Sequence, residues 1–146
     1  MAGIRVSTGE KHIEVNDNGD YITLNLNDNA FLDRFFALHE RIQGMVEELA
    51  GREAELRASA RDAGAEGLDS SRKEIFSLYK EAGGRIRAEV DTLFGEYTCQ
   101  KVFGDITPSF ELFFDFFEQL LPYLEEFAKE KAQRMRRYSA ARTGNV

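Results

Sequence analysis

Apolar and polar residues alternate along the first part of the chain, which is the pattern of a β-strand with one buried face. Three short runs show it, at residues 4–6, 12–15 and 21–26. Residues 16–20, Asn-Asp-Asn-Gly-Asp, separate the last two runs, and Asn-Gly favours the positive φ angles of a hairpin turn. We therefore expect residues 1–27 to form an antiparallel β-ribbon of two or three strands, which must pack against other elements to be stable.

Beyond residue 27 the apolar spacing changes to three and four, which is the spacing of an amphipathic helix. A long helix is expected over residues 28–62, with Asn27 or Asp28 as its N-cap. Residues 63–68 are rich in Gly and Ala and predict a linker. The apolar stripe of the helix consists of Phe31, Phe35, Leu38, Ile42, Met45, Leu49 and Leu56.

A second helix is expected over residues 69–97, with Asp69 or Ser70 as its N-cap. The two glycines at residues 83–84 weaken the middle of a helix and mark either a kink or a close approach of another segment. Residues 98–106 would connect this helix to the next. Its apolar residues repeat at alternating steps of three and four, which is a seam of coiled-coil type that packs in a core. They are Ile75, Tyr79, Ala82, Ile86, Val90, Leu93 and Tyr97.

A third helix is expected over residues 107–141, with Pro108 at its start and a kink near Pro122. A helix that packs on one core needs an apolar stripe a little over about 100° wide. This helix has more, because its apolar residues cover a second side as well. The surplus predicts a second contact, either with the β-ribbon of the same chain or with another protein. The stripe is Phe110, Phe113, Phe117, Leu120, Leu124 and Phe127, and the second side is Leu112, Phe114, Phe116, Leu121 and Tyr123.

The length indicates one domain that spans residues 1–146, and the apolar pattern makes that domain mainly α. No apolar run approaches the roughly 18–20 residues that cross a bilayer, and the start lacks the apolar core of a secretory signal. We therefore expect a cytoplasmic protein. The net charge of −7 is uneven, because the chain carries −12 before residue 129 and +5 from there on. The basic end suits docking on an acidic partner or a second copy, although a solvated helix C-terminus explains the same charges.

Residue types that carry chemistry are few and scattered. The chain has two histidines, His12 and His39, and one cysteine, Cys99, which are too few for a zinc site of the usual ligands. There is no Gly-rich phosphate loop, and adjacent carboxylates such as those at residues 47–48 point in different directions from a helix. We expect no enzymatic activity, no metal and no cofactor, and we expect Cys99 to be a small buried side chain.

Two passages of the chain resemble a known family. The first is the strand-to-helix passage at residues 19–29, followed by Phe31 and residues 34–36. The second runs from residues 102–105 through the Phe-rich helix to the ending at residues 137–146. In pattern and order they resemble the tail assembly chaperones of long-tailed phages and of prophages in Gram-positive bacteria. These are small tail proteins encoded before the tape-measure protein.

The resemblance implies a non-enzymatic chaperone in the cytoplasm of the bacterial host cell. Such a protein coats the tape-measure protein, recruits tail-tube subunits and self-associates. Alternative functions are a structural self-associating phage protein, such as a small tail or head-completion subunit, and a nucleic-acid-associated protein that uses the basic end. Partner binding is assigned to Phe113, Phe114, Phe116 and Phe117, and to Arg134, Arg137, Tyr138 and Arg142 in the basic end.

Overall fold

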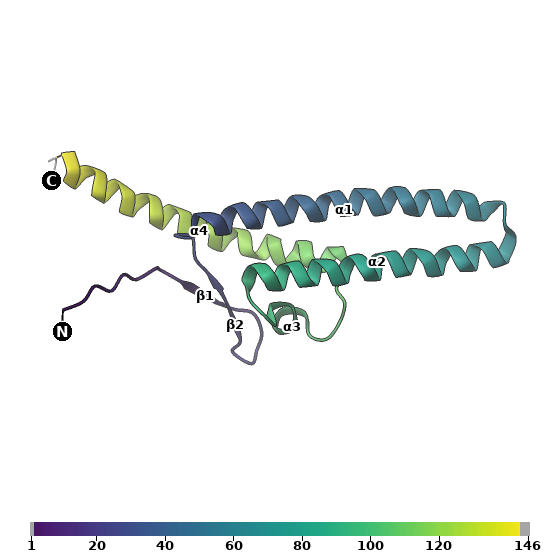
Figure 1. The fold of residues 1–146 in the computed structure, drawn as a ribbon, viewed down its shortest axis with the longest axis horizontal. Helices are drawn as coiled ribbons and strands as arrows, with labels where there is room; N and C mark the ends of the chain where they lie inside the picture. Colours follow the sequence, from purple (N-terminus) through teal and green to yellow (C-terminus); the bar gives the residue numbers. More distant parts are fainter. Residues whose placement is uncertain (1, 144–146) are drawn as a thin grey trace. The chain divides into compact units, whose positions relative to one another are not determined.

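The computed structural model describes residues 2–143 of the chain, and the burial of side chains as far as Ala140. The chain is mainly helical, with a two-stranded antiparallel hairpin, three long helices and one short helix (Figure 1), which confirms the expected fold class. It divides into two compact units, Met1–Leu112 and Phe113–Val146. The elements are β1 (Lys11–Glu14), β2 (Tyr21–Leu24), α1 (Asn29–Arg61), α2 (Gly64–Phe94), α3 (Thr98–Phe103) and α4 (Phe110–Thr143).

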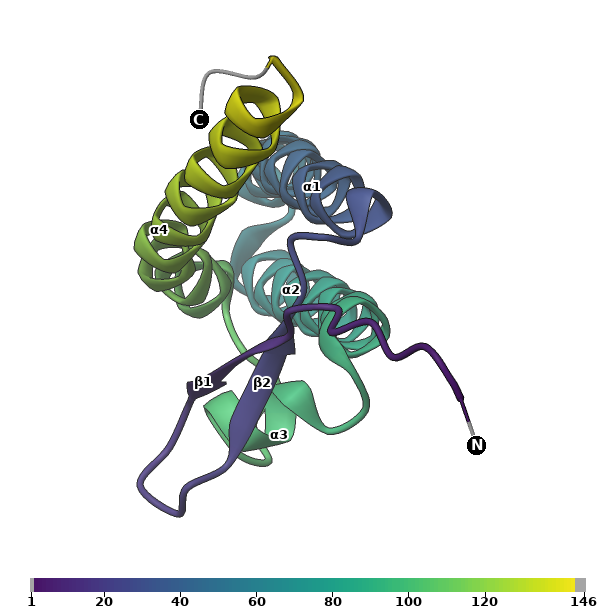
Figure 2. The ribbon, with the colours of Figure 1, turned by 90° about the vertical axis from the view of Figure 1, so that its left-hand side faces the viewer.

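The hairpin forms where turn chemistry and alternation agree. Strands β1 and β2 pair antiparallel with Ile13 opposite Ile22, and Gly19 adopts φ +83° in the turn. The Asn16 amide nitrogen donates to the carbonyl oxygen of Lys101, at 3.0 Å, so the turn is fastened to α3, beside which it lies in Figure 2. The third alternating run, at residues 4–6, is not a strand, and its Ile4 is 92% exposed. It has too little apolar cover to hold a third strand in place.

Helices α1 and α2 form an antiparallel pair and lie side by side in Figure 1. The N-cap of α1 is Asp28, one of the two residues that the sequence offered, since its carboxylate accepts a hydrogen bond of 2.9 Å from the Ala30 amide. At this end the apolar stripe is buried, and the ring of Phe94 meets that of Phe31 edge-on at 5.8 Å. The buried residues of this seam are Phe31, Phe35, Leu38 and Ile42 of α1, with Ala82, Ile86, Val90 and Phe94 of α2.

The predicted linker at residues 63–68 and the predicted start of the second helix at residue 69 are wrong. Only Asp62 and Ala63 separate α1 from α2, and Gly64 makes the turn with φ +76°. Ala, Glu and Leu in this segment favour a helix, and that preference outweighs the cost of Gly67. Asp69 therefore lies inside α2, where it pairs with Lys73 at 3.6 Å instead of capping a terminus.

The second helix ends at Phe94, three residues before the predicted end, and the expected connection contains the short helix α3. Gly95 and Tyr97 both adopt positive φ angles and reverse the chain. The Asp91 carboxylate then accepts a hydrogen bond of 2.8 Å from the Cys99 amide and so stabilises the first turn of α3. Cys99 is fully buried, as expected of a small apolar side chain.

The glycines at residues 83–84 mark a close approach of another segment. A Cβ added to Gly83 would lie 2.8 Å from the Pro108 carbonyl oxygen and 3.1 Å from Cγ2 of Thr107, whereas one added to Gly84 would meet open space. The Arg87 guanidinium fastens the same connection further along, donating to the carbonyl oxygens of Gly104 and Ile106. The segment that leads into α4 is thus held against one face of α2.

Helix α4 begins at Phe110, three residues after the predicted start, and continues through Pro122 without interruption. Its buried residues are Phe113, Phe116, Phe117, Leu120 and Leu124. Leu121 and Tyr123, on the predicted second side, are exposed. Among the residues that the structure describes, none of the helices combines the length and the apolar character needed to span a membrane.

Candidate binding site on the α1–α2 pair

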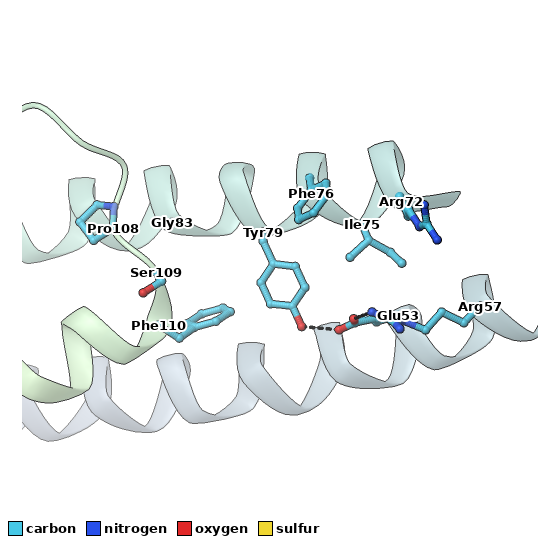
Figure 3. Close-up of a pocket in the computed structure, with 10 residues that line it drawn as sticks. All are labelled: Glu53, Arg57, Arg72, Ile75, Phe76, Tyr79, Gly83, Pro108, Ser109 and Phe110. Atoms are coloured by element: carbon cyan, nitrogen blue, oxygen red, sulfur yellow. Dashed lines mark hydrogen bonds and ion pairs between the residues drawn. The ribbon is translucent and has the colours of Figure 1, made fainter. Parts of the chain in front are cut away.

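A cavity of about 430 Å³ lies between the C-terminal half of α1, the N-terminal half of α2 and residues 108–110. Its wall is mostly apolar, and Figure 3 shows the ring of Phe110 beside that of Tyr79. These two rings make an edge contact with centroids 5.8 Å apart. The lining residues are Glu53 and Arg57 of α1, Arg72, Ile75, Phe76, Tyr79 and Gly83 of α2, and Pro108, Ser109 and Phe110.

A small polar network occupies one end of the cavity. The Tyr79 hydroxyl donates to Oε2 of Glu53 at 2.8 Å, and Nη2 of Arg57 donates to Oε1 of Glu53 at 2.6 Å. The hydrogen bond from Tyr79 is the main reason that the pKa of Glu53 is lowered, and the Arg57 bond adds to it. The same bond raises the pKa of the Tyr79 hydroxyl. Glu53 is therefore a fixed carboxylate with both oxygens engaged.

Two further residues line the cavity without being enclosed by the fold. Phe76 is 72% exposed although it is a large apolar side chain in the middle of a helix. Arg72 lies one turn before it on α2, and no hydrogen bond or ion pair holds its guanidinium within the described part of the chain. A concave, mostly apolar wall with a few polar groups is the usual lining of a binding site, which makes this cavity the candidate site.

Residues 18–145 match the model of a family of unknown function, DUF6673. This chain belongs to DUF6673. The matched residues contain β2 and all four helices, and therefore every residue that lines the cavity in this family member. No curated protein and no solved structure matches the chain.

The residues assigned to partner binding from the sequence differ in exposure. Phe113, Phe116 and Phe117 are buried, with Phe113 0% exposed, and Phe114 is half-buried. The exposed apolar residues near them are instead Leu112, Leu121 and Tyr123. In this DUF6673 chain, the assignment of partner binding to the four phenylalanines stays a prediction.

Most of the basic end is exposed as far as its side chains are described, although Glu130 and Lys131 are half-buried. Arg134, Arg137 and Tyr138 are exposed on α4, with Tyr138 at 73%. Arg142 lies beyond the residues whose side chains are described. Within the part of the chain that the structure describes, no three His, Cys, Asp or Glu side chains are grouped so that they could hold a metal ion.

The cavity was not predicted from the sequence, although two features of the pattern pointed to it. Glu53 falls at the spacing of the α1 stripe, between Leu49 and Leu56, where an apolar residue is expected. Phe76 is a large apolar residue outside the seam of α2, next to the seam residue Ile75. Both Glu53 and Phe76 thus depart from the apolar pattern of their helices, and both line the cavity.

Proposed function

We propose that this chain is a non-enzymatic assembly chaperone of a phage or prophage tail. It acts in the cytoplasm of the bacterial host, where it binds amphipathic helices of the tape-measure protein, keeps them soluble and recruits tail-tube subunits. The resemblance of two passages to tail assembly chaperones supports this function. The observation that carries it is the apolar cavity of about 430 Å³ on the α1–α2 pair, with Phe76 exposed at its edge.

The cavity suits a helix better than a flat surface would. A recurring way to bind an amphipathic helix is to accept its apolar side chains in a groove between two helices. Here α1 and α2 supply the two walls, and Ile75, Tyr79 and Phe110 supply apolar atoms between them. Covering the ring of Phe76 would remove apolar surface from water, which is worth about 25 cal/mol per Å².

Exposed apolar side chains on α4 provide a second surface for the same task. Leu121 and Tyr123 are exposed on this helix, and Tyr138 follows in the basic end with Arg134 and Arg137. A chaperone that binds two kinds of partner, tape measure and tube subunit, needs two surfaces. We assign the cavity to the tape-measure protein and the α4 surface to the tail-tube subunit.

The test is co-expression with the tape-measure protein encoded by the neighbouring gene. We expect the tape-measure protein to be insoluble alone, and soluble and co-purifying when this chain is present. Phe76→Ser should reduce the recovered complex, and circular dichroism should show that the variant stays folded because Phe76 is exposed. Tyr138→Ser is the matched comparison, since its ring is exposed to the same degree and lies in the basic end.

Two results would contradict the proposal. One is a tape-measure protein that stays insoluble, or purifies alone, in the presence of this chain. The other is a chain that remains strictly monomeric by light scattering at every concentration and forms no complex with tape-measure or tube protein. A complex that is lost in Tyr138→Ser but kept in Phe76→Ser would instead move the tape-measure site to the basic end.

A further inference from the structure

The volume of the cavity determines how many side chains it can accept. A cavity of about 150 Å³ in a protein core holds one benzene ring, and the cavity on the α1–α2 pair has about 430 Å³. It therefore has room for two apolar side chains. On a helix, two side chains three or four residues apart lie about 5–6 Å from each other and enter the same groove. The volume thus favours a partner helix with two apolar residues at that spacing.

Among the residues that line the cavity, positive groups outnumber negative groups at one end. Arg57 and Arg72 bring two guanidinium groups to this end, and Glu53 brings one carboxylate (Figure 3). That carboxylate is already engaged by Arg57 and by the Tyr79 hydroxyl. Arg72 has no ion pair or hydrogen bond to any residue that the structure describes. An incoming carboxylate would complement this end, whereas an incoming ammonium would be repelled.

The position of Arg72 sets where that carboxylate has to be. Arg72 and Phe76 are four residues apart on α2 and so lie one turn apart on the same face. A partner helix that runs along α2 and covers Phe76 with an apolar residue meets Arg72 one turn further on. Its acidic residue must then lie three or four positions from that apolar anchor.

We infer that the cavity selects amphipathic helices of a partner protein that carry an Asp or Glu one turn from a pair of apolar anchor residues. The inference rests on the proposed function, because it names the chemistry of the helix that the chaperone binds. Arg72 pairs with the acidic residue, and the apolar wall with Phe76 packs against the two anchors. The matching is by charge complementarity at one end of the cavity and by volume along the rest.

The test uses three labelled helical peptides that differ at one position. Each carries two Leu anchors four residues apart, with Glu, Gln or Lys one turn C-terminal to them. A second set of three peptides places this residue one turn N-terminal to the anchors. Binding to the full chain is measured by fluorescence anisotropy at low and high salt. We expect the Glu peptide of one set to bind about two- to five-fold more tightly than the Gln peptide, and the Lys peptide most weakly. High salt should reduce this preference.

Two charge reversals on the same helix separate a specific contact from a general field. Arg72→Glu should reverse the order, so that the Lys peptide binds more tightly than the Glu peptide. Arg85→Glu is the matched control, because Arg85 is also exposed on α2 but lines a different hollow together with Met45 and Arg52. It should leave the order unchanged. Phe76→Ser should weaken all peptides alike.

Equal binding of the three peptides, absence of binding, or an order that Arg72→Glu leaves unchanged would each overturn the inference. So would a homo-oligomer that Arg72→Glu dissociates and that no peptide displaces, because the occupant would then be a second copy of this chain. These outcomes are distinct from failure of the proposed function. If the tape-measure protein binds but the peptides show no acidic preference, the proposed function stands and the inference is wrong. If the peptides bind as expected but the tape-measure protein does not bind, the inference stands and the proposed function is wrong.

Discussion

The two adjacent glycines of α2 allow a sharp test of how the segment before α4 packs. Gly83→Ala and Gly84→Ala introduce the same methyl group at neighbouring positions of one helix. At Gly83 the new Cβ would lie 2.8 Å from the carbonyl oxygen of Pro108 and 3.1 Å from Cγ2 of Thr107. At Gly84 nothing lies within 4 Å of it. The pair therefore differs in packing and not in helix propensity.

The magnitude follows from two opposing contributions. Replacing Gly by Ala in a helix interior raises the free energy of unfolding by about 1 kcal/mol at either position. At Gly83 the contact with backbone atoms of Pro108 adds an overpacking cost of about 1–3 kcal/mol. Gly84→Ala should thus stabilise the chain by about 1 kcal/mol, while Gly83→Ala should be neutral or destabilise it by up to about 2 kcal/mol. The difference between the two variants measures the overpacking cost directly.

Urea denaturation followed by circular dichroism measures both free energies. The slope with urea concentration should be the same in the two variants, because neither changes the surface exposed on unfolding. A Gly83→Ala variant that gains as much stability as Gly84→Ala would refute the close packing of Thr107 and Pro108 on α2. The same result would argue against the cavity as described, because Gly83 and Pro108 form part of its wall.

Three further predictions concern single side chains of the first compact unit. Ser71 has a buried hydroxyl without a hydrogen-bond partner in the described structure, so Ser71→Ala should raise the free energy of unfolding by about 0.5–1.5 kcal/mol in urea, and a loss of stability would contradict this. Burial, with the nearby Asp91 carboxylate, raises the pKa of the Cys99 thiol to about 12. The thiol should therefore react with Ellman's reagent at pH 8 only after unfolding, and rapid reaction in the native state would disprove its burial. Tyr79→Phe should raise the pKa of Glu53 in an NMR titration, because the Tyr79 hydrogen bond is the main cause of its lowering. Since a lowered pKa stabilises the fold above the ordinary carboxyl pKa and is lost as pH falls through the folded value, the variant should lose less stability on acidification than the native chain.

Local sequence patterns predicted the elements whose causes are local. The hairpin rests on Gly19 in its turn and on strand alternation, and the start of α1 rests on Asp28 as its cap. Helix α3 could not be predicted in this way. Its first turn is stabilised by Asp91, which lies on the preceding helix and reaches the amide of Cys99 only after the chain reverses at Gly95. The interaction exists only in the folded chain.

The prediction of a linker at residues 63–68 was wrong for a different reason. A segment rich in Gly and Ala predicts a loop, yet Ala is the strongest helix former and only Gly64 of this segment needs a conformation that other residues avoid. One glycine with φ +76° is enough to reverse the chain, and the helix resumes immediately. The boundary between α1 and α2 therefore depends on the φ angle of Gly64. The average composition of residues 63–68 does not reveal that angle.

The candidate cavity follows from a conflict between the two helical patterns. Ile42 and Ile86, in the apolar stripes of α1 and α2, are fully buried. At Glu53 the α1 stripe carries a carboxylate, and the facing Tyr79 uses its hydroxyl to satisfy it instead of packing against an aliphatic residue. Violations of local pattern are expected where a protein binds something, and this one lines the same cavity as the exposed ring of Phe76. Glu53 thus interrupts the apolar stripe of α1 and also provides the polar end of the cavity.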